Sequence, residues 1–259
     1  MKRISRLLIL FSLLSFTAKA YPSFYPPILN SGLPKYGFGY GASGVISFFK
    51  VDPRESEKAI PRLGGGGIFK FEFYPTSNVH IQLGFELMSQ ACSFNTYYFA
   101  PGYSTYYDRS FGYTHTLRTT EMYLPLLVRI GLQPNEGNLR TIFYFLGGYA
   151  PKIFLGATTN VVDNSTGKGI WGGSTELTFE NYFVGQDVGN VLMGGFGCDK
   201  RFGFSGRYMT FEAIFRYGLS RFNYDMGRND YNFLLIKNYC ISLEVGYRFA
   251  GGGKSGGVN

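Results

Sequence analysis

The sequence predicts an all-β fold: an eight-stranded, antiparallel, up-and-down transmembrane β-barrel with short periplasmic turns and long outer loops. Three observations predict it: a secretion signal at the amino terminus, long segments in which apolar and polar residues alternate, and links between those segments that are alternately short and long. Of the 259 residues, 45% are hydrophobic and 16% are charged, which excludes a disordered chain. No stretch reaches the roughly 18 apolar residues of a membrane-spanning helix.

The amino terminus is typical of a cleaved signal peptide, residues 1–20. A basic start precedes an apolar run, and Ala18-Lys19-Ala20 gives the small-x-small pattern that signal peptidase reads. Cleavage after Ala20 removes four basic residues and no acidic one, so 25 basic residues become 21 against 17 acidic ones and the formal charge falls from +8 to +4. Such a small excess gives no reason to expect nucleic acid as a partner. The remaining chain divides into an N-terminal periplasmic segment (21–34), the outer-membrane β-barrel (35–249) and a flexible glycine-rich tail (250–259).

The alternating segments have period two and exceed the five or six residues of an ordinary globular strand. In residues 239–249 the odd-numbered positions are all aromatic or aliphatic, whereas the even-numbered ones include Ser242, Glu244 and Arg248. One face of such a strand is apolar and the other polar, although the phase is less regular in the first, fifth and sixth strands. The eight predicted strands are residues 35–49, 69–73, 79–88, 121–132, 141–155, 191–204, 208–220 and 239–249.

The links between strands distinguish two architectures that share this alternation. A soluble β-sandwich turns its apolar faces inward, whereas an outer-membrane barrel turns them toward lipid. Strictly alternating short and long links are typical of the barrel. A secreted soluble β-sandwich binding protein stays open as the alternative. The short links are residues 75–78, 133–138 and 205–206, and the long ones are 50–62, 93–112, 157–190 and 223–235.

Three motifs indicate a known family. Residues 121–129 (EMYLPLLVR) form an aliphatic strand broken by Pro125, residues 71–74 (FEFY) lead into a hairpin, and residues 246–249 (GYRF) end the last strand. Over residues 35–249 the chain resembles the PorT-like outer-membrane β-barrel proteins of Bacteroidota. The resemblance implies an eight-stranded barrel and, from the family's named member, an accessory role in type IX protein secretion. Because proline removes a ladder donor, we expect a bulge or local bend at Pro125.

The polar faces of the strands carry charges of both signs, which a barrel would place in its lumen. An eight-stranded barrel is barely wide enough to pack its own side chains, so we expect an ion-pair plug and not a conducting pore. A proton or ion pathway through paired Glu and Arg residues is the alternative. The predicted lumen charge network consists of Lys70, Glu72, Glu86, Glu121, Arg129, Glu212, Arg216, Glu244 and Arg248.

Function outside the lumen would fall to the long outer loops. The link 93–112 is dense in aromatic residues, and the link 157–190 holds the only tryptophan. The aromatic residues of the link 93–112 suit protein contact, an extension of the strands above the membrane, or the interfacial aromatic belt. The net-negative link 157–190 suits binding of a partner or a surface glycan, although a plain solvated loop is favoured there. The candidate partner-binding residues are Tyr97, Tyr98, Phe99, Tyr103, Tyr106, Tyr107 and Trp171.

The sequence predicts no catalytic, cofactor or metal site. The histidines are His80 and His115 alone, no Cys-x-x-Cys pair occurs, and the three cysteines allow at most one disulfide. The Gly-x-Gly-x-x-Gly run at 39–44 lacks the helix that a dinucleotide site needs. An outer-membrane lipid-modifying enzyme stays open as an alternative. Its histidine would be His80 or His115, with Glu121 on the same face as His115, but a hydrogen-bonded structural histidine is favoured.

We therefore expect a non-enzymatic outer-membrane protein with a structural or assembly role, exported through a cleaved signal peptide in a Gram-negative cell. Its expected partners are outer-membrane lipid, the barrel-assembly machinery during insertion, and secretion-system proteins. Nucleic acid is not among them.

Overall fold

The computed structural model describes residues 36–52, 59–75, 79–97, 112–132, 141–174, 177–180, 188–202, 207–225 and 233–251. All regular secondary structure in these ranges is β-strand. Within the same ranges, no helix is long and apolar enough to cross a membrane. The strands are β1 (Tyr36–Asp52), β2 (Ile60–Phe73), β3 (Val79–Tyr97), β4 (Gly112–Tyr123), β5 (Leu126–Gly131), β6 (Thr141–Asp163), β7 (Gly169–Ser174), β8 (Leu177–Glu180), β9 (Val188–Phe202), β10 (Arg207–Gly218), β11 (Arg221–Asp225) and β12 (Phe233–Gly251).

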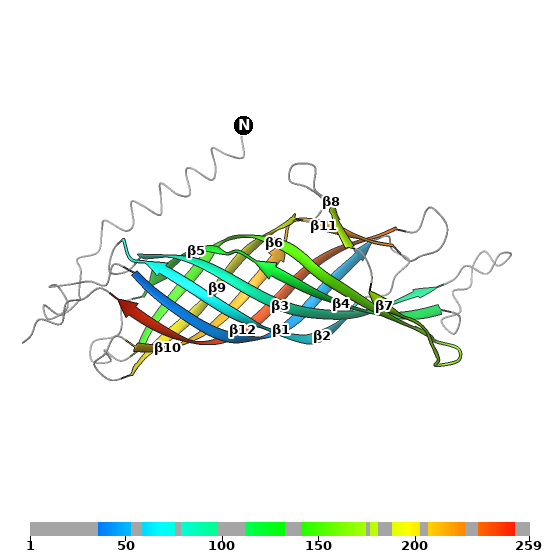
Figure 1. Ribbon diagram of the computed structural model, residues 1–259, viewed down its shortest axis with the longest axis horizontal. Helices are drawn as coiled ribbons and strands as arrows, with labels where there is room; N and C mark the ends of the chain where they lie inside the picture. Colours follow the sequence, from blue (N-terminus) through cyan, green and yellow to red (C-terminus); the bar gives the residue numbers. More distant parts are fainter. Residues whose placement is uncertain are drawn as a thin grey trace, which may run out of the picture.

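The strands close into a ring of eight antiparallel positions (Figure 1). The order is β1, β2, β3, β4 with β5, β6, β9, β10 and β12, and the ring closes because β12 pairs with β1. β4 and β5 share one position, since both lie between β3 and β6. The predicted eight-stranded up-and-down barrel is thereby confirmed. The shorter strands β7, β8 and β11 pair with β6, β11 and β12 and extend the sheet at one end.

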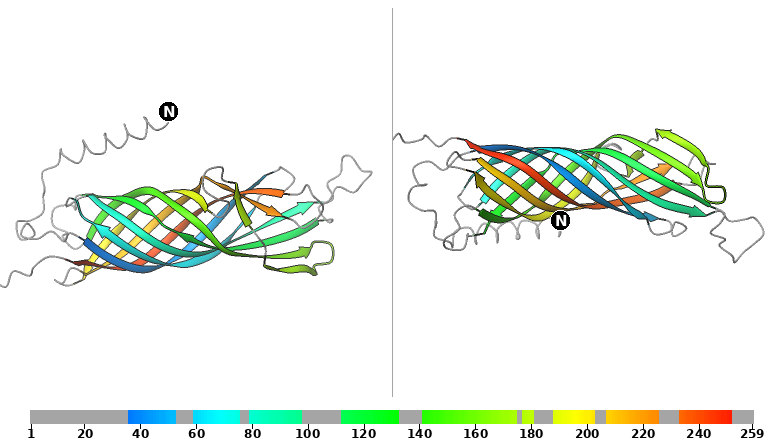
Figure 2. Two further views of the ribbon diagram at one scale, coloured as in Figure 1. Left: turned by 45° about the horizontal axis from the view of Figure 1, so that its top comes forward. Right: turned by 90° about the horizontal axis from the view of Figure 1, so that it is seen from below.

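The strands run obliquely around the barrel, as both views in Figure 2 show. The stagger of the closed sheet is ten residues. A path that starts at Tyr36 of β1 and passes from each residue to its direct partner on the next strand returns to β1 at Ile46. A closed sheet with such a stagger forms only if its strands tilt, typically by about 35–45° from the barrel axis. The path between the two ends runs through Phe73, Ile81, Val128, Gly147, Gly194, Phe215 and Ile241.

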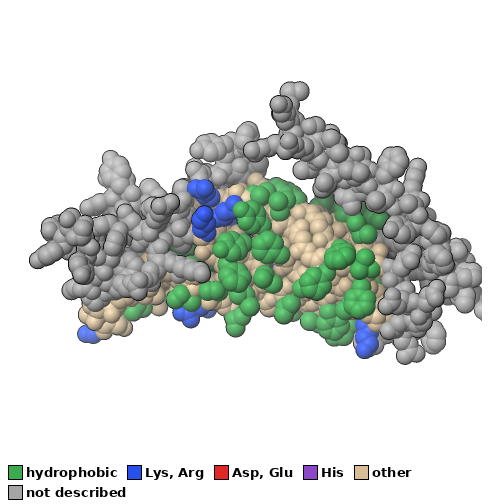
Figure 3. Space-filling view, turned by 180° about the vertical axis from the view of Figure 1, so that it is seen from behind, with side chains coloured by type: hydrophobic (Ala, Val, Ile, Leu, Met, Phe, Trp, Pro, Cys, Tyr) green, Lys and Arg blue, Asp and Glu red, His purple; other side chains and the backbone are tan. Residues whose placement is uncertain are grey.

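The outward face of the ring is apolar. In β2, Phe69 and Phe71 are 52% and 45% exposed, whereas Glu72 is 2% exposed. Figure 3 shows hydrophobic side chains spread over the outside of the barrel, with lysine and arginine side chains toward its two ends. An apolar exterior is the orientation expected of a barrel and the reverse of a soluble sandwich. Exposed hydrophobic side chains on the other strands include Tyr40, Leu83, Phe85, Leu126, Phe145, Leu192, Phe196, Phe215, Leu243 and Val245.

Several strands are longer than the sequence predicted. β3 reaches Tyr97 and β6 reaches Asp163, whereas the predicted strands ended at 88 and 155, and β4 begins at Gly112 instead of 121. From Ser89 to Asn95 the outward positions of β3 are small or polar, so the alternation fades although the ladder with β4 continues. The predicted long link at 157–190 is therefore wrong in part, because β6, β7 and β8 occupy much of it.

Pro125 separates β4 from β5 without changing the register with β3. A register shift in this strand position lies instead in the ladder with β6, between Thr120 and Glu121. Gly84 of β3 lies against the proline: its N–H donates to the Pro125 carbonyl at 2.9 Å, and an added Cβ would stand 2.6 Å from the proline Cγ. The proline ring therefore fits because Gly84 has no side chain, and the bulge expected at Pro125 is found elsewhere.

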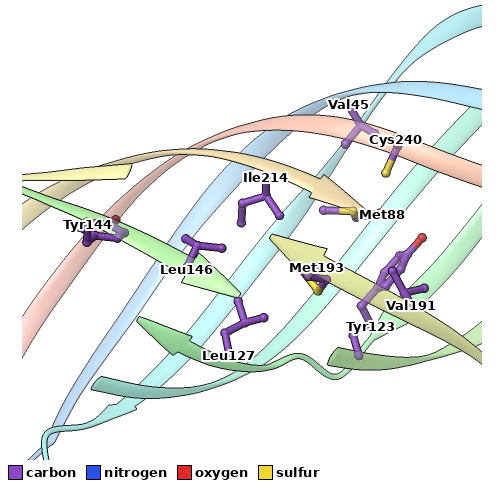
Figure 4. Close-up of a cluster of buried hydrophobic side chains, with 11 residues drawn as sticks. Val45, Met88, Tyr123, Leu127, Tyr144, Leu146, Val191, Met193, Ile214 and Cys240 are labelled. Carbon is purple, nitrogen blue, oxygen red and sulfur yellow. The ribbon is translucent and has the colours of Figure 1, made fainter. Parts of the chain in front are cut away.

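Two apolar clusters occupy parts of the interior. The first spans the middle of the ring, and Figure 4 shows its side chains pointing toward one another from different strands. The second lies near the end of β1 and β3 that is far from the short turns, where the Phe222 ring meets those of Phe49 and Phe154 edge to face at centroid distances of 6.1 and 5.2 Å. We call it the outer apolar cluster, and its members are Phe49, Cys92, Phe94, Leu117, Ala157, Phe222 and Ile236.

Replacing Gly84 by Ala should destabilise the barrel, because the new Cβ would press against the rigid ring of Pro125. Overpacking of this kind costs about 1–3 kcal/mol. Unfolding in urea, followed by the different gel mobilities of the folded and unfolded barrel, measures the change. Gly67→Ala in β2 is the matched control, since nothing lies within 4 Å of a Cβ there. In a Pro125→Ala background the cost of Gly84→Ala should largely vanish, and an undiminished cost would contradict this explanation.

Candidate functional site

The candidate functional site is the polar interior, and the structure brings all nine residues of the predicted lumen charge network into it. Lys70 keeps 13% of its side chain exposed, and the other eight side chains are at most 6% exposed. Buried charges are stable only when they are paired and hydrogen-bonded. The network divides into three groups along the barrel, each with its own pairing.

The first group, nearest the short turns, is a closed ring of two arginines and two acids. Arg129 Nη1 lies 3.1 Å from Glu72 Oε1, and Arg248 Nη1 lies 2.6 Å from Glu72 Oε2. Both guanidinium groups also contact Asp199 Oδ2, so positive and negative charges alternate around the ring. The Tyr74 hydroxyl donates to Glu72 at 2.9 Å. Each charge in this group therefore has two opposite neighbours.

The second group joins four strands across the lumen through a shared carboxylate. Glu244 Oε2 lies 2.9 Å from Lys70 Nζ, and its other oxygen lies 2.6 Å from Arg216 Nη2. Lys70 also pairs with Glu212, and Arg216 pairs with Glu86 at 2.7 Å. Because these residues come from β2, β3, β10 and β12, the group ties opposite sides of the barrel together.

The third group lies directly beneath the outer apolar cluster. Lys152 Nζ is 3.2 Å from Glu121 Oε2 and 5.9 Å from the centroid of the Phe222 ring. The Tyr123 hydroxyl donates to Glu121 and accepts a hydrogen bond from Gln90 Nε2 at 2.6 Å. The outer apolar cluster lies above this group, and among the described side chains the line of ion pairs ends here.

The sequence analysis missed two members of the network, Lys152 and Asp199, which are 1% and 0% exposed. They lie on β6 and β9, where many inward positions are apolar, as at Leu146 and Met193. With apolar residues on both faces, period-two alternation no longer marks the inward one. One signal was usable: Lys152 is the only charged residue in the predicted strand 141–155, and a lone charge in an apolar strand faces the interior more readily than lipid.

The histidines and cysteines are placed within the barrel wall. His115 is buried and stacks on Phe94, its cross-strand partner, with ring centroids 5.2 Å apart. His80 Nδ1 lies 3.8 Å from Glu72 Oε2. The three cysteines are free. In the described part of the chain no group of His, Cys, Asp and Glu residues could hold a metal ion.

The β6–β7 hairpin carries Trp171, which is exposed on β7 and does not lie in a loop. Asp163 orders the turn: its carboxylate accepts hydrogen bonds from the Ser165 hydroxyl at 2.6 Å and the Ser165 N–H at 2.7 Å. The hydrogen bond from the hydroxyl, followed by that from the N–H, lowers the pKa of Asp163 below its usual value. The other aromatic candidates, Tyr98, Phe99, Tyr103, Tyr106 and Tyr107, lie outside the described residues, as does the side chain of Tyr97.

The fold and interior define a class: a closed eight-stranded β-barrel with an apolar exterior and a paired, charged interior. Neither a family model nor a curated protein matches the chain. Among solved structures, outer membrane protein OprG from Pseudomonas aeruginosa is 12% identical, with a TM-score of 0.47 over 85% of this chain and 98% of that one. Neisserial surface protein A is 9% identical, with a TM-score of 0.38 over 83% and 97% of the two chains. Ail, the attachment invasion locus protein of Yersinia pestis, is 12% identical, with a TM-score of 0.31 over 83% and 99%. These TM-scores lie below 0.5, so the proposals that follow rest on this chain's own contacts.

Replacing Lys152 by Met should destabilise the barrel by about 3–5 kcal/mol, because Glu121 would keep a buried charge without its cation. The additional change Glu121→Gln should recover much of the loss, since it removes the unpaired charge. The free energy of unfolding in urea measures both effects. The matched control is Lys200→Met on the outward face of β9, which should change stability by no more than about 0.5 kcal/mol. Equal losses for the two lysines would contradict the pairing described.

Proposed function

We propose that the protein is an outer-membrane β-barrel that has no enzymatic activity and serves a structural or assembly role. One observation carries the proposal: a ring whose outward face is apolar encloses charges that neutralise one another. A soluble sandwich has its apolar residues inside and its polar residues outside, and this barrel has the reverse. The hydrocarbon core of a membrane accounts for that arrangement.

The exterior supports the membrane environment. Exposed phenylalanine, leucine and tyrosine side chains surround the whole ring, far beyond the apolar patch of a few hundred Å² that soluble monomers carry. A tilted strand of roughly 9 to 11 residues crosses a bilayer. β1, with 17 residues, and β12, with 19, are long enough to cross and to continue beyond it.

The interior favours a plug over a pore. The nine predicted charges together with Lys152 and Asp199 make eleven, and each has an opposite charge within 4 Å. The outer apolar cluster then lies above them, where Phe49, Phe94 and Phe222 are buried. An ion would have to replace these contacts to pass, which argues against conduction as the function.

The placement of His115 argues against the alternative of a lipid-modifying enzyme. A lipid substrate would approach from the outward face, whereas His115 is buried and stacked on Phe94. A histidine held in this way stabilises the wall and is poorly placed to meet a substrate. We therefore favour the non-enzymatic role.

The location can be tested in membrane fractions. The folded protein should be recovered with the outer membrane and should migrate faster on an unheated gel than after boiling, because a closed barrel resists detergent until it is heated. An intracellular enzyme followed in the same fractions controls for contamination. Recovery of the whole pool in the soluble periplasmic fraction would overturn the proposal.

We further propose, on the resemblance of residues 121–129 and 246–249 to the PorT-like barrels, that the role is accessory to type IX protein secretion. Deleting the gene should then reduce the amount of secreted cargo in the culture medium, measured by quantitative mass spectrometry. Complementation with the intact gene is the control. Unchanged secretion would reject this role and leave the barrel proposal intact.

A further inference from the structure

A group of four cations lies on the outward face at the level of the outer apolar cluster. Because successive residues of a strand point to opposite faces, a residue next to a buried member of that cluster points outward at the same height. Three cations occupy such positions. Arg62 of β2, which is exposed, lies at the same height because its Nε donates to Ser93, the residue between the cluster members Cys92 and Phe94 on β3. We call Lys50, Arg62, Arg118 and Lys237 the cationic collar. Lys50, Arg118 and Lys237 directly follow Phe49, Leu117 and Ile236, respectively.

The collar lies where the apolar exterior ends. Lys50 is opposite Lys237 in the β1–β12 ladder. Phe48 is opposite Tyr239, and this pair lies on the same face, two residues nearer the short turns. These two rings stack with centroids 5.8 Å apart and an angle of 8° between their planes. An aromatic pair followed by a pair of cations is the order expected where hydrocarbon gives way to headgroups.

The charge of the collar has no acidic counterpart on that surface among the described side chains. The acidic side chains that the structure describes are buried in the ring, apart from Asp163 in the hairpin turn, and no acidic side chain appears on the described part of the face in Figure 3. The acids inside are already matched by interior cations such as Arg216 and Arg248. Two lysines placed directly opposite each other repel, which destabilises the bare sheet.

The collar side chains are also held in position. Lys237 Nζ donates to the Tyr217 hydroxyl at 2.8 Å and lies 4.2 Å from the centroid of its ring. Arg62 Nε donates to Ser93 Oγ at 3.1 Å. Among the described residues this contact uses one of the five guanidinium N–H groups of Arg62, and the side chain is exposed, so the rest of its fork can bind phosphate oxygens.

We propose that the cationic collar binds the phosphate groups of a lipid in the outer leaflet, with one phosphate bridging Lys50 and Lys237. This inference rests on the membrane location proposed above, because only there do headgroups meet the collar. A bridging phosphate would convert the repulsion between the two lysines into two charge-assisted contacts. The tail of the same lipid would pack against the apolar exterior directly below, next to Phe48 and Tyr239.

The test uses the full chain folded in detergent micelles and titrated with two lipids, bisphosphorylated lipid A and the same lipid with its phosphates removed. Native mass spectrometry gives the fraction of protein with lipid bound. Wild type should bind the phosphorylated lipid more tightly. Each cation removed should weaken binding about fivefold, so the variant Lys50→Gln/Lys237→Gln should lose about 25-fold. The matched control is Lys200→Gln/Arg207→Gln, two exposed cations at the opposite end, which should keep wild-type affinity.

Equal affinity for the two lipids, or equal losses in the collar and control variants, would overturn the collar proposal. Complete displacement of the lipid by millimolar inorganic phosphate would overturn its assignment to a lipid. The gel shift on heating is measured first on every variant. A wild-type chain without that shift would refute the barrel proposal itself and the collar with it, whereas a normal shift without phosphate preference refutes the collar alone.

Discussion

Inside a ring of eight strands there is little room for water, so an inward charge must be neutralised by a side chain of another strand. Glu72 meets Arg129 from 57 positions away in sequence and Arg248 from 176 positions away. Since the partners come from different strands, each ion pair is also a constraint on how those strands lie relative to one another. A one-residue slip of β12 would turn Arg248 and Glu244 out toward lipid and bring two apolar residues in.

The exterior follows from the same constraint. With the polar faces committed to the interior, period-two alternation places the intervening residues outside, and through the middle of the barrel most of these are phenylalanine, leucine, isoleucine and tyrosine. The composition therefore has a structural meaning: the abundant aromatic residues cover a surface that ordinary soluble proteins avoid. The mean hydropathy is near zero, −0.04, because each strand has one apolar and one polar face. The sequence therefore contains no long apolar stretch of the kind that marks a membrane-spanning helix.

The sequence predicted those features of the structure that depend on the alternation of apolar and polar residues within a strand. The faces of β2, β3, β4, β5, β10 and β12, and with them the nine interior charges, follow from alternation along the sequence. Which charge meets which could not be predicted, because Lys70 and Glu212, for example, are 142 positions apart and meet only after the ring closes. The far ends of β3 and β6 were missed because most of their outward residues are small or polar, so no alternation marks the strand there. Lys152 and Asp199 were missed because the first apolar cluster occupies the inward face of their strands.

The seam between the first and last strands of the ring has a kinetic consequence. All 17 residues of β1 have a directly opposed partner in β12, in one register without interruption from Tyr36 to Asp52. The pairing is continuous along the whole seam, so the barrel wall has no weakly paired stretch at which these two strands would separate first. Because the seam joins the two ends of the barrel sequence, it forms only when the last strand arrives, and afterwards it must separate along its whole length for the ring to reopen. The folded molecule should therefore persist through the height of its unfolding barrier, over and above its equilibrium stability.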